Sequence, residues 1–135
     1  MKTLFDLRDG SPVIPVTERI KTFDDACRAL GIDKVQIGIV GLDKDCESIE
    51  AYLKLIVIAR ALNEGWEPDW SNSSEGKYMP WFEHKSGFGL AYGDYDFWFS
   101  CAGVGSRLCF KSKELAIYAG KQFADIYNDY LTIKQ

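Results

Sequence analysis

Residues 48–63, which read SIEAYLKLIVIARALN, decide the fold of this chain. Ile49, Leu53 and Ile56 recur at helical spacing, and the apolar residues between them leave little polar surface on the other faces. A helix that is apolar nearly all round has to be covered on most sides, so it lies at the centre of its domain. The stretch therefore predicts a central buried helix with Ile56 fully buried, and Gly65 predicts its end.

The residues before this helix predict an extended arm and a second, shorter helix. Two prolines fall within residues 1–19 and remove backbone donors, which favours an extended N-terminal arm. Thr22 is a good N-cap and Gly31 a good C-terminal stop, so a short helix is expected between them. Residues 35–39 alternate between apolar and other residues, a pattern that permits either a strand or an irregular linker.

Aromatic residues dominate the chain after the central helix, and the spacing of apolar residues changes there from a helical pattern to one typical of strands. Residues 66–76 are rich in turn formers and predict a long structured loop that holds two tryptophans. Four aromatic-rich runs, separated mainly by glycine-containing turns, follow at residues 78–83, 88–92, 95–101 and 107–110. They predict an antiparallel sheet of three to four strands, whose last hairpin turns at residues 103–105.

The C-terminal part of the chain predicts a helix that covers one face of this sheet. Ser112 is a good N-cap, and the apolar residues that follow at helical spacing include Leu115, Phe123 and Tyr130. We expect Phe123 to be fully buried. The whole chain, residues 1–135, is thus predicted to form a single α+β domain.

Composition limits where the protein acts and what it binds. Of the 135 residues, 47% are hydrophobic and 27% charged, as in an ordinary folded domain. The net charge of −4 speaks against wholesale binding to nucleic acid or an anionic membrane, because both require an excess of Lys and Arg, although a local basic patch stays open. The N-terminus is charged where an export signal needs an unbroken apolar stretch, and the longest apolar run is too short to cross a bilayer. We therefore expect a cytoplasmic protein with no membrane partner.

Cysteine and histidine offer little support for metal or cofactor chemistry. The four cysteines are Cys27, Cys46, Cys101 and Cys109. Without an export signal, the reducing cytosol should keep them as thiols. They also lack the paired spacing of a metal site, so we expect neither a metal nor a cofactor. His84 is the single histidine, and its place beside a turn favours a solvated residue. A pocket shared by His84, Arg107 and one of Cys101 or Cys109 stays open as an alternative.

Positive charge gathers around the predicted start of the last helix. Arg107, Lys111 and Lys113 are close in sequence within an acidic chain, beside a helix N-terminus whose N–H groups attract anions. They predict an anion-binding site, with a solvated sheet edge as the alternative. Trp70 and Trp81 lie in or beside the polar loop and are candidates for a partner surface or a base-stacking platform, unless the loop packs them over the central helix.

Three sequence blocks carry a resemblance to a known family. Residues 18–27 read ERIKTFDDAC, residues 61–70 read ALNEGWEPDW, and residues 106–112 read SRLCFKS. Together they resemble the signature of an uncharacterised family of small proteins from phage and integrated mobile elements of gut bacteria, over residues 18–131. The resemblance implies a mobile-element origin, and it brings no catalytic residues to carry over.

The sequence favours a non-enzymatic binding protein over an enzyme, because no nucleophile, metal or phosphate-loop signature is present. We expect a protein or single-stranded nucleic acid to be bound through the aromatic loop, residues 66–76, and the basic hairpin, which turns at residues 103–105 and carries Arg107 and Lys111. One alternative is a small enzyme or ligand-binding domain with a pocket near His84 and Arg107. Another is a structural phage component that functions by self-assembly as a homo-oligomer.

Overall fold

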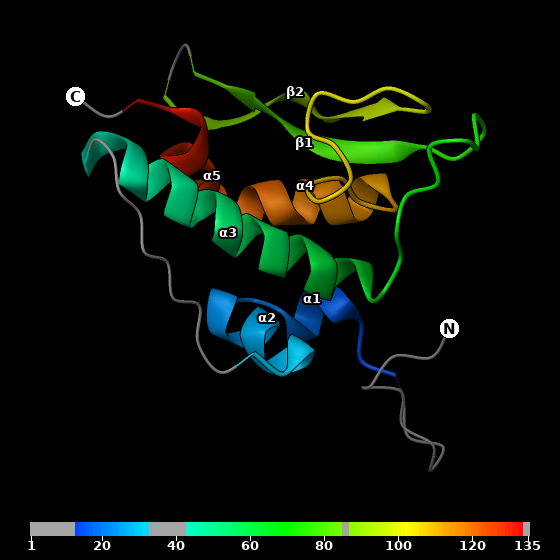
Figure 1. The fold of residues 1–135 in the computed structure, drawn as a ribbon, viewed down its shortest axis with the longest axis horizontal. Coiled ribbons are helices and arrows are strands. Elements are labelled where there is room, and N and C mark those ends of the chain that lie inside the picture. The colour runs from blue at the N-terminus through cyan, green and yellow to red at the C-terminus, as the bar shows by residue number, and fades with distance from the viewer. Residues whose placement is uncertain (1–12, 33–42, 85–86, 134–135) are drawn as a thin grey trace.

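The computed structural model describes residues 13–32, 43–84 and 87–133. The elements along the chain are α1 (Val16–Arg19), α2 (Phe23–Leu30), α3 (Asp43–Asn63), β1 (Lys77–Glu83), β2 (Gly89–Trp98), α4 (Lys113–Gln122) and α5 (Ala124–Leu131). Figure 1 shows them as layers: the sheet packs on α4, α3 runs along α5 and beneath α4, and α2 lies on the opposite side of α3. The fold is α+β, as predicted.

Helix α3 forms the centre of the molecule. It packs against α2, α4 and α5, and Leu55, Ile58 and Leu62 on it are buried. The helix begins at Asp43, before the stretch that predicts it. The prediction that Ile56 is fully buried is wrong: its side chain is half-buried, because it lines a pocket instead of packing wholly against another element.

Three predicted helix boundaries are confirmed. At the start of α2, Thr22 Oγ1 accepts a hydrogen bond from Asp25 N at 3.0 Å, and the Asp25 carboxylate accepts one from Thr22 N at 3.1 Å, which forms a capping box. Gly31 ends α2 with a φ of 70°, a left-handed conformation that glycine adopts without steric cost. At the start of α4, Ser112 Oγ accepts a hydrogen bond from Leu115 N at 3.2 Å.

The sheet formed by the described residues has two antiparallel strands, not the three to four that the sequence predicts. The two middle runs belong to one strand, because β2 continues through Gly93 instead of turning there. The pairing with β1 shifts its register between Pro80 and Phe82. Between these two paired positions β2 has more residues than β1, so the ladder is irregular there. The predicted turn falls at this irregularity.

The fourth predicted strand, residues 107–110, is reduced to one bridge. Phe110 N donates to Tyr78 O at 2.7 Å, and Tyr78 N donates to Phe110 O at 3.0 Å. On either side of Phe110, the backbone groups of Cys109 and Lys111 bond to the side chain of Asn63. These groups point away from β1, so Asn63 takes the outer edge of the bridge, and the predicted basic hairpin is an irregular connection that is tied to α3.

The C-terminal region packs on the sheet as predicted, since α4 contacts both strands. It is divided into two helices at Phe123, whose φ of −114° departs from helical geometry. The backbone bonds continue across the division, from Phe123 N to Ala119 O at 2.9 Å and from Tyr127 N to Phe123 O at 3.0 Å. The division therefore costs no hydrogen bond at these positions, and Phe123 is buried as predicted.

The predicted N-terminal arm is extended only in part where the structure describes it. Residues 1–12 of the arm, like the predicted strand at 35–39, lie outside the described residues. Within the remainder, one helical turn forms α1 after Pro15, whose missing N–H is not needed at a helix start. Arg19 Nη2 lies 3.0 Å from Glu64 Oε2, and this ion pair holds α1 against the end of α3.

Candidate anion-binding pocket

A pocket of about 450 Å³ opens where the end of α3 meets residues 65–68 and the turn at residues 106–107. Its wall includes Arg60, Trp66, Glu67 and Arg107. Both arginines are exposed, and the wall contains these two cationic residues and one acidic residue, Glu67. We call this feature the Arg60–Arg107 pocket. Its excess of positive charge suits an anionic ligand.

The end of α3 shapes one side of the pocket. Glu64 and Gly65 have positive φ values of 50° and 88°, and Trp66 N donates to Asn63 O at 3.0 Å. The chain thereby turns back and places Trp66 in the wall. A left-handed conformation is unfavourable for glutamate and needs support from its surroundings. The ion pair between Glu64 and Arg19, whose side chains are both largely buried, supplies this support.

The buried side chain of Asn63 joins the two arginine-bearing segments. Asn63 Nδ2 donates to Cys109 O at 2.9 Å, and Asn63 Oδ1 accepts a hydrogen bond from Lys111 N at 3.1 Å. The amide uses its donor and its acceptor much as a backbone peptide group would. It thereby fixes the segment that carries Arg107 to the helix that carries Arg60.

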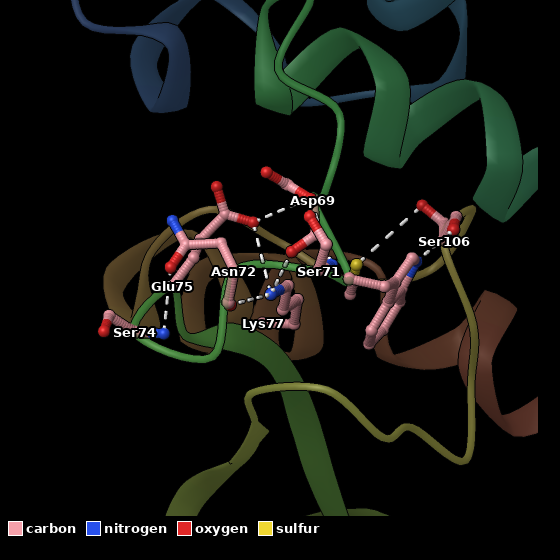
Figure 2. Close-up of polar contacts among 9 residues, drawn as sticks. Asp69, Ser71, Asn72, Ser74, Glu75, Lys77 and Ser106 are labelled. Atoms are coloured by element: carbon pink, nitrogen blue, oxygen red, sulfur yellow. Dashed lines mark hydrogen bonds and ion pairs between the residues drawn. The ribbon is translucent and has the colours of Figure 1, made fainter.

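Lys77 is a fully buried lysine enclosed by the loop that precedes β1. Its ammonium donates to Asp69 O at 2.7 Å and to Asn72 O at 3.0 Å, and it lies 3.4 Å from Glu75 Oε1 (Figure 2). It also lies 5.3 Å from the ring centroid of Trp70. Burial of a charge is unfavourable unless the charge is paired and hydrogen-bonded. The loop thus surrounds the ammonium with oxygen atoms as it would a metal cation, and Lys77 orders the loop.

Side chains of the loop satisfy its own backbone. Ser71 donates to Asp69 Oδ1 from its hydroxyl at 2.6 Å and from its backbone at 3.0 Å. These hydrogen bonds hold the pKa of Asp69 below its usual value, so the carboxylate is charged at neutral pH. Ser74 N donates to Asn72 Oδ1 at 2.9 Å in a second turn of the same kind. The loop is therefore structured although it contains no helix or strand.

Trp70 connects this loop to the turn that carries Arg107. Its indole Nε1 donates to Ser106 Oγ at 2.7 Å. Its ring is half-buried and lies against the Lys77 ammonium. Trp70 therefore supports the wall of the Arg60–Arg107 pocket, and a direct contact between Trp70 and a partner stays a prediction.

The structure separates the other residues that the sequence suggests for a binding site. Arg107 lines the pocket, whereas Lys111 and Lys113 are exposed but are not part of its wall. Trp81 lines another hollow, near the end of β1. Of the five residues suggested for binding, Arg107 lines the Arg60–Arg107 pocket, and Trp70 is linked to the pocket through its hydrogen bond to Ser106, which is also in the wall.

Sequence reasoning missed Arg60 and Trp66. Arg60 interrupts an otherwise apolar stretch close to the end of α3. A cation on a helix that is buried on most sides has to reach solvent, so its position signals an opening at that end. Trp66 follows the helix-ending Gly65 directly, and its place in the wall depends on how the chain turns there.

The residues suggested for an enzyme are placed apart in the described part of the chain. His84 lines the hollow that contains Trp81, whereas Arg107 lines the Arg60–Arg107 pocket. Cys109 is buried, and burial raises the pKa of its thiol to about 11. The thiol is thus protonated at neutral pH and is a poor nucleophile. Cys101 is exposed and belongs to neither wall.

No protein-family model, curated protein or solved structure matches this chain. Within residues 13–32, 43–84 and 87–133, no group of three His, Cys, Asp or Glu side chains could hold a metal ion. In the same part of the chain, no helix combines the length and the apolar character that a bilayer crossing requires. We therefore infer a function from the Arg60–Arg107 pocket.

Proposed function

We propose that this protein is a non-enzymatic binding protein that takes phosphate groups of a single-stranded nucleic acid into the Arg60–Arg107 pocket. The observation that carries the proposal is that two arginines from distant segments line one pocket together with Trp66. A planar guanidinium can donate two parallel hydrogen bonds to one phosphate. An indole ring can stack on any base, so the same pocket offers both elements of single-strand binding.

Pre-organisation of the pocket supports this proposal. Asn63 fixes the Arg107 segment to α3, and the bond from Trp70 to Ser106 fixes the neighbouring turn. Lys77 in turn orders the loop that carries Trp70. A wall that is already held in place loses little conformational entropy when a ligand binds, which favours affinity.

The charge of the whole chain predicts weak and salt-sensitive binding. With a net charge of −4, the protein repels a polyanion at long range, so affinity has to come from the local arginines. Each neutralised phosphate of a single strand contributes a slope of about −0.7 to the logarithm of affinity against the logarithm of salt concentration. If both arginines bind phosphate, we expect a slope of about −1.4.

The aromatic end of β2 favours self-assembly as a second candidate function. Phe97 and Phe99 are 44% and 43% exposed, and their ring centroids lie 5.6 Å apart. Contiguous exposed apolar side chains are typical of protein interfaces. Sedimentation at increasing protein concentration tests this candidate, which requires association that Phe97→Ser weakens.

The experiment for the nucleic-acid proposal compares two double variants that remove the same charge. A labelled oligothymidylate is titrated against the wild type, against Arg60→Gln/Arg107→Gln, and against Lys111→Gln/Lys113→Gln, with fluorescence anisotropy as the readout. Loss of charged hydrogen bonds should weaken binding to the arginine variant by about tenfold or more. The lysine variant removes two exposed charges outside the pocket wall and should bind nearly as well as the wild type.

Two results would contradict the proposal, once melting curves show that all three proteins fold. Equal weakening in both double variants would indicate general electrostatic attraction without a site. A preference of the wild type for an acidic peptide over the oligonucleotide, lost in the arginine variant, would assign the pocket to a protein partner.

A further inference from the structure

Two further hollows, each of about 260 Å³, lie next to one another and share no residue with the Arg60–Arg107 pocket. One lies between the end of β1 and α5 and is lined by Trp81 and Leu131. The other lies between the start of α3 and α5 and is lined by Ile49. Val104 and Tyr130 line both hollows. We call these two neighbouring hollows the paired hollows.

The walls of the paired hollows are held by contacts between helices and sheet. The rings of Tyr52 and Tyr130 stack with their centroids 5.5 Å apart, and Ser48 Oγ donates to Tyr130 O at 2.8 Å. On the other side, the rings of Phe82 and Tyr127 lie 4.9 Å apart. These contacts join α3 to α5 and α5 to β1, so the hollows are formed before any ligand binds.

Large apolar side chains remain exposed around the paired hollows. Trp81 is 53% exposed, Leu131 46% and Ile49 45%. A single exposed apolar residue needs no explanation, but apolar residues grouped around concave surface are typical of an interaction site. Two neighbouring hollows suit a partner helix whose apolar anchors recur three or four residues apart.

The charges on the three segments that supply most of the wall are of one sign, whereas Arg107, on the fourth lining segment, lines the Arg60–Arg107 pocket instead. Residues 45–52, 79–84 and 124–131 supply most of the wall, and they contain neither Lys nor Arg. Their acidic residues are Asp45, Glu47, Glu50, Glu83, Asp125 and Asp129. This contrasts with the Arg60–Arg107 pocket, so the two sites suit ligands of opposite charge.

Two of these carboxylates stand next to lining residues. Asp45 precedes Ile49 by one helical turn, and Glu83 follows Trp81 by two residues on the same strand, so each is expected on the side of its neighbour. Both are exposed. A second copy of this acidic chain is a poor occupant, because its net charge of −4 repels that side of the molecule.

We propose that the paired hollows bind a basic amphipathic helix of a partner protein. Two apolar side chains on consecutive turns of that helix enter the hollows, and its Lys or Arg residues face the carboxylates at the rim. The proposal does not depend on nucleic-acid binding, because the two sites have no residue in common.

The test selects ligands from a displayed library of random peptides on the intact protein. We expect enriched peptides to carry two large apolar residues three or four positions apart and an excess of Lys and Arg. Their affinity should fall at least tenfold for Trp81→Ser/Leu131→Ser. It should be unchanged for Trp98→Ser, which replaces a tryptophan of similar exposure (45% against 53% for Trp81) outside the hollows and serves as the matched control. All substituted residues are about half exposed, so the variants are expected to fold, which melting curves verify.

A charge variant separates a basic partner from an apolar one. Asp45→Asn/Glu83→Gln should weaken the selected peptides and reduce the salt dependence of their binding. The proposal is overturned if no peptide is enriched above a protein-free surface, if the enriched peptides lack basic residues, or if all variants bind alike. It is also overturned if the protein dimerises in sedimentation and Trp81→Ser/Leu131→Ser abolishes the dimer, because the occupant is then a second copy.

Discussion

The side chain of Asn63 holds the backbone of Lys111, whose N–H donates to Asn63 Oδ1 at 3.1 Å across 48 residues of sequence. The same amide group is buried, and its Nδ2 donates to Cys109 O at 2.9 Å. One residue at the end of α3 thus ends the growth of the sheet and fixes the turn that carries Arg107. The stability of the domain and the shape of the Arg60–Arg107 pocket depend on the same two hydrogen bonds.

Replacement of Asn63 by leucine should destabilise the domain. Leucine has a similar size but leaves Cys109 O and Lys111 N buried without their partners, at a cost of about 2 to 4 kcal/mol. Urea denaturation of the wild type and Asn63→Leu measures the difference. A change below about 0.5 kcal/mol, the range of ordinary surface substitutions, would mean that water satisfies both groups equally well.

Replacement of Lys77 by methionine should loosen the loop that supports the pocket. The variant removes the donors to Asp69 O and Asn72 O, which should lower the free energy of unfolding by about 2 to 3 kcal/mol. It should also weaken oligonucleotide binding, because Trp70 loses its support. The exposed Lys113→Met is the control and should stay within about 0.5 kcal/mol of the wild type. If both variants melt alike, the enclosed ammonium does not order the loop.

Two isoleucines of α3 should differ in their response to truncation. Ile58 is fully buried, so Ile58→Ala should cost about 2 to 5 kcal/mol. Ile56 lines the pocket and is half-buried, so Ile56→Ala should cost roughly half as much. Denaturant melts of the two variants measure their free energies of unfolding. A larger loss for Ile56→Ala than for Ile58→Ala would mean that the core does not lie on the Ile58 side of α3.

The capping box of α2 should make stability depend on pH. The backbone N–H of Lys21 donates to the Asp25 carboxylate and, with the hydrogen bonds from Thr22, holds the pKa of Asp25 below its usual 3.8. The charged carboxylate therefore stabilises the fold above the unfolded value, and this contribution is lost as pH falls through the lower folded value. The stability difference between the wild type and Asp25→Asn should be full near pH 6 and should shrink below pH 3.8. Asp24→Asn is the control, and an equal effect of pH on both variants would refute a specific role of Asp25.

Local sequence was sufficient for the features that depend on local chemistry. Thr22, Gly31 and Ser112 mark helix ends because a cap requires a particular side chain or φ at one position. The central helix follows from an apolar run that admits no other placement. A sheet of three to four strands could not be excluded in the same way, because the bridge of Phe110 to Tyr78 and the bonds of its neighbours to Asn63 join segments that are distant in sequence.

The candidate site depends on the same kind of distant contact. Arg107 was predicted as a binding residue together with Lys111 and Lys113, its neighbours in sequence, yet its partner in the pocket is Arg60. Sequence spacing contains no information on which turn meets which helix end. The bond between Trp70 and Ser106 could not be predicted for the same reason, since it joins two irregular segments.

The most direct test of the proposed function follows the side-chain N–H signals of the ¹⁵N-labelled protein during titration with an oligothymidylate. If Arg60, Arg107 and Trp66 form one binding pocket, their Nε signals should shift together and saturate with a single dissociation constant, while the indole signal of Trp81 stays in place. Unchanged signals of both arginines, with shifts at Trp81 or at the backbone of Lys111 and Lys113 instead, would contradict the account.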